Sequence, residues 1–135
     1  MGWRNILLGL GICLFAIVLC PLVRAKVDTG LVYYGDSEQD YYAPGEIDCA
    51  EIFVQIPEYR KILEENLDTK SGKYWTLLRK ANDKFQVAVR KTAKNHGLDL
   101  ICETGQVSEQ VRKTLDKDYK MDYTEDVKKV VEEIL

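Results

Sequence analysis

Few residues of this sequence combine the types and spacing that catalysis needs. The single histidine, His96, precedes Gly97 at a predicted helix end, where a cation interacts favourably with the helix dipole. Asp116, Asp118 and Asp122 offer carboxylates for a cation, but the glycine and the final glutamate of a calcium-binding loop are misplaced. The sequence also contains no GxSxG, HExxH, P-loop or GxGxxG motif. We therefore expect no catalytic residue, no metal site and no cofactor.

Basic residues gather in one segment of a chain that is acidic overall. The sequence has 19 Lys and Arg against 22 Asp and Glu, yet Asp83 is the lone acid between residues 73 and 96. Such a segment is ordinarily a solvated helix face that keeps a protein soluble. The alternative is a positive surface that binds anionic lipid or an acidic client segment. The candidate residues of this surface are Arg79, Lys80, Lys84, Arg90, Lys91 and Lys94.

Residues 1–25 have the layout of an export signal. Arg4 precedes an almost unbroken apolar run over residues 6–19, and small or branched residues precede a cleavage point after Ala25. The alternative is an uncleaved inner-membrane anchor over residues 6–23, which is at the short end of what spans a bilayer. In both cases we expect an exported protein of the periplasm. Nucleic acid is not an expected partner of an acidic, exported chain.

Two cysteines, Cys49 and Cys102, follow the expected signal. An oxidising compartment permits a disulfide between them. Their separation matches neither a Cys-x-x-Cys motif nor a metal-ligand pattern, and a buried cysteine often packs as a small apolar side chain. Both a bridge and separate core packing stay open.

Residues 26–135 are long enough for one small domain with a core of its own. Residues 26–45 read as a Tyr-rich arm with a short strand at 31–34. Asp48 and Glu51 form a capping box that starts a helix, which Pro57 either kinks or divides. Its expected apolar stripe is Ile52, Ile56, Tyr59, Leu63 and Leu67.

A second helix is predicted after a connection at residues 68–72, and Gly97 ends it as a left-handed cap residue. Joined by a short turn, the two helices form an antiparallel hairpin. The expected buried seam of the second helix is Tyr74, Leu78, Ala81, Phe85, Ala88 and Thr92, widened by Leu77 and Val89.

The remaining residues predict a strand at 98–102, stopped by Gly105, and a final helix. Residues 106–115 read either as a strand and loop or as a short helix, and residues 118–123 as a strand. Thr124 is the expected N-cap of the last helix, which buries Val127, Val130, Val131 and Ile134. The fold class is therefore α+β: a small β-sheet with an antiparallel helical hairpin and a C-terminal helix.

Several segments together resemble a known family. The stretch 84–102, KFQVAVRKTAKNHGLDLIC, followed by Gly-Gln-Val at 105–107 and Asp-Tyr-Thr-Glu-Asp-Val at 122–127, resembles the C-terminal half of Skp/OmpH-like periplasmic chaperones. Residues 47–53 and 56–60 are similar to the family's N-terminal entry from strand to helix. Residues 46–135 are therefore identified as a Skp/OmpH-like α+β domain.

The resemblance implies an ATP-independent periplasmic holdase that binds unfolded exported or outer-membrane proteins. It also implies a homo-oligomer, which in the family is a trimer. Two features depart from the family: the hairpin spans only about residues 49–96, so the long arms are missing or short, and Pro44 lies where the first strand would run. The alternative is a non-enzymatic envelope module that docks one partner or self-associates. An unrecognised hydrolase or ligand carrier is a third, minor reading.

Overall fold

The computed structural model of the chain describes residues 31–36 and 41–135. These include the whole of the expected domain at 46–135 and parts of the Tyr-rich arm at 26–45. The export signal expected at residues 1–25 and the alternative anchor at 6–23 lie outside the described residues.

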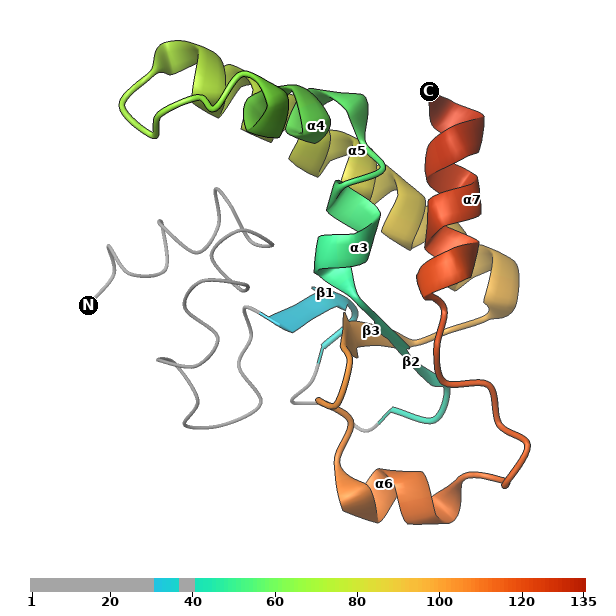
Figure 1. The fold of residues 1–135 in the computed structure, drawn as a ribbon. Coiled ribbons are helices and arrows are strands. Elements are labelled where there is room, and N and C mark those ends of the chain that lie inside the picture. The colour runs from blue at the N-terminus through green and yellow to red at the C-terminus, as the bar shows by residue number, and fades with distance from the viewer. Residues whose placement is uncertain (1–30, 37–40) are drawn as a thin grey trace.

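A small mixed sheet lies at the centre of the fold (Figure 1), with its described strands in the order β1-β3-β2. β1 (Val32–Tyr34) pairs antiparallel with β3 (Leu100–Glu103), and β2 (Pro44–Ile47) pairs parallel with β3. Parallel strands need a long crossover between them. Here the crossover contains the helical hairpin, so the sheet and the hairpin form one connected unit.

Helices surround this sheet and confirm the predicted α+β class. In Figure 1 the hairpin and the C-terminal helix lie on one side of the sheet, and α6 lies on the other side. The helices are α3 (Cys49–Phe53), α4 (Pro57–Glu64), α5 (Gly72–His96), α6 (Glu109–Thr114) and α7 (Thr124–Ile134).

The first predicted helix is two helices, α3 and α4. The Asp48 carboxylate accepts from the Glu51 amide at 3.2 Å, which confirms half of the capping box. The other half is wrong, because the Asp48 amide donates to Thr124 Oγ1 and the Glu51 carboxylate binds Lys128. Pro57 is the first residue of α4, a position where its missing N–H costs no helical hydrogen bond.

The break before Pro57 shifts the buried face of α4. Ile52 and Ile56 are buried as expected, but the next fully buried side chain is Ile62, while Leu63 is 53% exposed. The prediction of Leu63 as a core residue is therefore wrong. A single helix keeps one phase of 3.6 residues per turn, and the non-helical residues 54–56 reset that phase.

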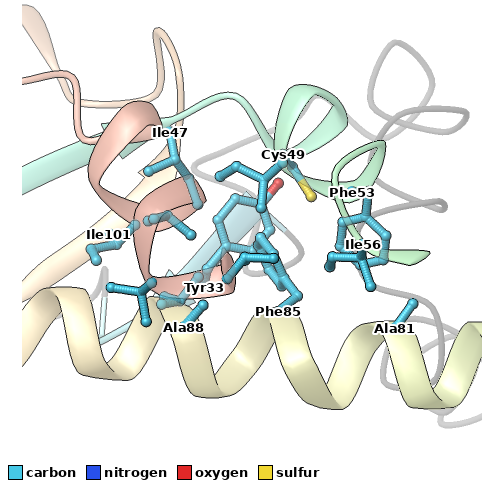
Figure 2. Close-up of a cluster of buried hydrophobic side chains, with 14 of the residues drawn as sticks. Tyr33, Ile47, Cys49, Phe53, Ile56, Ala81, Phe85, Ala88 and Ile101 are labelled. Carbon is cyan, nitrogen blue, oxygen red and sulfur yellow. The ribbon is translucent and has the colours of Figure 1, made fainter. Parts of the chain in front are cut away.

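The second predicted helix, α5, is confirmed in both its limits and its buried face. Ser71 caps its first turn by accepting from the Tyr74 amide, and Gly97 ends it with φ of 65°. All six predicted seam residues are buried, together with Val89, while Leu77 is only partly buried. Figure 2 shows Ala81, Phe85 and Ala88 projecting from α5 towards Phe53 and Ile56 on one side and Ile101 on the other.

Pro44 does not prevent strand pairing. It is the first residue of β2, opposite Leu100 of β3, and β2 is an outer strand of the described sheet. A missing N–H is tolerated at such a position. The proline noted as a departure from the family is therefore compatible with strand pairing.

The segment before α7 is not the strand predicted at residues 118–123. Its backbone pairs with β2 at an isolated bridge between Glu46 and Asp122, which is too short to make it a strand of the sheet. Thr124 is not the N-cap but the first residue of α7, and Asp122 Oδ1 accepts from both the amide and the hydroxyl of Thr124. These two hydrogen bonds, the hydroxyl one foremost, hold the pKa of Asp122 below its ordinary value.

Residues 106–115 were predicted to form either a strand and loop or a short helix, and they contain the short helix α6. Ser108 caps it by accepting from the Val111 amide. A part-buried ion pair fixes α6 to the sheet, since Arg112 Nη2 lies 2.6 Å from the buried Glu46 Oε2. The same oxygen accepts from the amides of Gly105 and Val107. Beneath α6 a second apolar cluster forms on the far face of the sheet, around Leu100, Cys102 and Val107.

Candidate binding surface

Five of the basic residues of α5 form one solvent-exposed face, which we call the basic strip and define as Arg79, Lys80, Arg90, Lys91 and Lys94. At 3.6 residues per turn these positions fall within about one third of the helix circumference and extend over about 22 Å. The opposite side of α5 is the buried seam, so packing onto the core forces the strip outward.

Two of the six predicted cations are held in salt bridges with other helices. Lys84 is half-buried and pairs with Glu58 of α4, and Lys91 pairs with Glu133 of α7 at 3.1 Å. Arg79, Lys80, Arg90 and Lys94 have no salt bridge within residues 31–36 and 41–135. Lys84 therefore links α5 to α4 within the hairpin. The four cations without a salt bridge are available to bind a partner.

The pKa of Glu58 reflects its ion pair with Lys84. Burial raises the pKa of Glu58, but hydrogen bonds from Lys84 and from its own amide, with the charges of Lys84 and Lys80, lower it overall. Glu58 is thus held as a carboxylate beneath the strip, and Lys84 contributes to the hairpin rather than to the exposed charge.

The end of the hairpin where α4 meets α5 lies away from the sheet (Figure 1), and apolar side chains are exposed there. Leu63 near the end of α4 is 53% exposed, and Trp75 at the start of α5 is 39% exposed. The Trp75 indole is not loose, since its N–H donates to the Thr69 carbonyl and its ring packs edge-on against Tyr74 at 5.1 Å. We call Leu63 and Trp75 the apolar tip.

One member of the apolar tip, Trp75, lies next to the strip along the same helix. Within α5, Trp75 precedes Arg79 by one helical turn. Val87 adds a further apolar side chain, 44% exposed, between the cations of the strip. The exposed surface of the hairpin thus alternates apolar groups with unpaired positive charge.

The sequence predicts the exposed cations of α5 but not the exposed side chains of the apolar tip. The apolar periodicity places Leu63 in the core, and it gives Trp75 no role. The available signal is Pro57, because a proline that starts a new helix resets the phase of every later residue.

The bridge left open between Cys49 and Cys102 is not present. Cys102 is a free, buried thiol. It belongs to the apolar cluster under α6, whereas Cys49 belongs to the main core on the hairpin side, so the two side chains serve different faces of the sheet. Burial raises the pKa of the Cys102 thiol to about 12, which keeps it protonated and unreactive.

Neither a metal site nor a membrane span emerges from the described residues. Across residues 31–36 and 41–135 no three His, Cys, Asp or Glu side chains gather as metal ligands would. No helix in the same ranges is both long and apolar enough to cross a bilayer.

His96 lies 3.5 Å from Asp126 and contacts the Tyr123 ring, so it joins α5 to α7.

Comparisons with known proteins return no match: no family model, no curated protein and no solved structure is significantly similar to this chain.

Proposed function

We propose that this protein is a Skp/OmpH-like holdase of the periplasm, which binds unfolded exported or outer-membrane proteins without ATP. The segments that carry the sequence resemblance support this proposal by their placement. Residues 84–102 run from α5 through the left-handed Gly97 into β3, and residues 122–127 form the turn that starts α7. Residues 47–53 lead from β2 into α3.

The observation that carries the proposal is the exposed hairpin surface, which presents the apolar side chains of Leu63 on α4 and Trp75 on α5 together with the unpaired cations of the basic strip on α5. An unfolded polypeptide offers apolar side chains to the apolar tip and acidic side chains to the strip. Burial of apolar area stabilises such a complex by about 25 cal/mol per Å². Contacts of this kind are weak individually, so a client is held and released without nucleotide hydrolysis.

The test is suppression of aggregation. An outer-membrane protein is unfolded in urea and diluted into buffer with or without the full chain, and light scattering is followed. We expect scattering to fall at stoichiometric protein. Scattering that stays at the level of the buffer control contradicts the proposal.

The contribution of the basic strip is separable by a charge-matched pair of variants. Lys80→Gln/Lys94→Gln removes two unpaired charges from the strip, and Lys117→Gln/Lys129→Gln removes two exposed, unpaired lysines away from the hairpin. We expect weaker suppression from the first variant only, with an effect that shrinks as salt screens the charges. Equal behaviour of the two variants shows that the strip has no special role.

The resemblance also leads us to propose a homo-oligomer, a trimer as in the family. Sedimentation equilibrium of the full chain measures this directly, and a monomer at all concentrations contradicts it.

A second candidate function is an envelope interaction module that docks one specific partner or self-associates. The observation in its favour is the length of α4, which at eight residues makes a short arm with little surface for enclosing a client. Affinity capture from the envelope distinguishes the two functions: one partner at fixed stoichiometry favours the module, and a broad set of outer-membrane proteins favours the holdase.

A further inference from the structure

A pocket of about 400 Å³ opens beside α6. The helix α6 lies on the side of the sheet away from the hairpin (Figure 1). Its apolar lining consists of Leu115, Tyr119 and Met121, from the segment that leads from α6 towards α7. Its charged lining consists of Arg112, Lys113, Asp116 and Lys117. No part of this pocket belongs to the basic strip or the apolar tip.

The walls of the pocket are fixed to the sheet by hydrogen bonds. Arg112 donates to the Glu46 carboxylate at 2.6 Å and, through Nε, to the Val107 carbonyl at 3.2 Å. The Tyr119 hydroxyl donates to the Pro44 carbonyl at 2.7 Å. Burial raises the pKa of Tyr119 to about 12, so this hydroxyl keeps its proton. The pocket is therefore formed before any ligand arrives, which lowers the entropic cost of binding.

The charges that face the pocket are not balanced. Buried Glu46 neutralises Arg112, and this ion pair raises the pKa of the guanidinium. Lys113 and Lys117 are exposed and have no salt bridge within the described part of the chain, while Asp116 is the lone acid of the lining. The lining therefore combines a net positive charge with apolar side chains.

We infer that this pocket binds a small organic anion with an apolar body and one carboxylate. The apolar body would cover Leu115 and Met121, and the carboxylate would lie between the amines of Lys113 and Lys117. The Arg112 guanidinium is already engaged through Nε and Nη2 and its charge is paired with Glu46, so the proposed carboxylate is assigned to the two lysine point charges. A volume of about 400 Å³ lies within the range of small-molecule sites.

Two sources supply this chemistry, a free carboxylic acid and the C-terminal carboxylate of a peptide that ends in an apolar residue. The probes are accordingly 4-phenylbutyrate and the peptide acetyl-Gly-Gly-Leu with a free carboxylate. Two control probes each lack one half of the chemistry: 4-phenylbutanamide has no charge, and inorganic phosphate has no apolar body.

Methyl NMR of the full chain labelled at methionine reports on the pocket, because Met121 is one of only two methionines. We expect a saturable shift of the Met121 methyl signal with one or both carboxylate probes, at a Kd of about 0.1–10 mM. Whichever carboxylate binds identifies the source. The inference is overturned if neither carboxylate gives a saturable shift, or if phosphate or the amide gives the same shift.

A pair of lysine variants tests the placement of the carboxylate. Lys113→Gln/Lys117→Gln is expected to weaken binding at least about threefold, since each exposed lysine contributes a modest ion pair. The matched control, Lys70→Gln/Lys129→Gln, removes the same total charge from sites outside the pocket and is expected to keep the original affinity. Equal weakening by both variants shows that net charge alone attracts the probe and overturns the inference.

Discussion

Phe53 and Phe85 pack against each other at the centre of the molecule, with ring centroids 4.9 Å apart. Tyr33 of β1 meets the same Phe85 ring edge-on, at 5.3 Å. One side chain of α5 thus contacts α3 on one side and the sheet on the other (Figure 2). The hairpin and the sheet therefore depend on the same core, and the exposed hairpin surface is positioned by it.

Phe85→Ala is expected to lower the free energy of unfolding by about 3–5 kcal/mol, because it leaves a cavity where both rings now pack. Urea denaturation followed by circular dichroism measures the loss. Val87→Ala is the control on the exposed face of the same helix, with an expected loss within about 0.5 kcal/mol. A loss below about 1 kcal/mol for Phe85→Ala would place this ring outside the core.

Thr124→Val should lower the free energy of unfolding by about 1–3 kcal/mol, because the part-buried amide of Asp48 loses its acceptor. The shape of the side chain is nearly preserved, so the loss reports on the hydroxyl. The comparison variant is Thr114→Val, whose hydroxyl bonds only to an exposed carbonyl of its own helix. Equal losses for the two would mean that the Thr124 hydroxyl does not link the starts of α3 and α7.

Glu103→Gln tests how a part-buried carboxylate affects the pH dependence of stability. This carboxylate accepts hydrogen bonds from the Tyr33 hydroxyl and the Cys49 amide. Burial raises the pKa of Glu103 above 4.5, although hydrogen bonds from the Tyr33 hydroxyl and the Cys49 amide oppose the shift. The folded state therefore binds this proton more tightly than the unfolded state, and stability from Glu103 is lost as the pH rises through its raised pKa. The wild type should lose stability relative to Glu103→Gln as the pH increases above 4.5.

Thermal unfolding over a pH series measures this difference. Glu132→Gln, at an exposed position of α7, removes the same charge and serves as the matched control. If both variants follow the same pH dependence relative to the wild type, burial of Glu103 is not its cause.

The sequence is a reliable guide wherever one helix runs without interruption. The seam from Tyr74 to Thr92 repeats with the period of an α-helix, and Gly97 ends it in a conformation that glycine favours. The exposed position of Arg79, Lys80, Arg90 and Lys94 follows from the same period, because these residues lie opposite the seam.

Prediction fails where a residue's role depends on a distant partner. Thr124 accepts from Asp48, 76 positions away, and Glu46 pairs with Arg112, 66 positions away. Local patterns carry no record of either contact, so they predict Thr124 as a cap and do not predict the pocket beside α6. They group Lys84 and Lys91 with the exposed cations for the same reason, since the partners of these lysines lie on α4 and α7.

The apolar tip of the hairpin is the surface that we propose holds unfolded polypeptides, and one paired comparison tests this claim most directly. Leu63→Ser alters the tip, and Leu135→Ser makes the same change at the C-terminus, where the side chain is similarly exposed, 58% against 53%. In the light-scattering assay we predict that Leu63→Ser loses much of the suppression of aggregation while Leu135→Ser keeps it. Equal suppression by the two variants would contradict the claim.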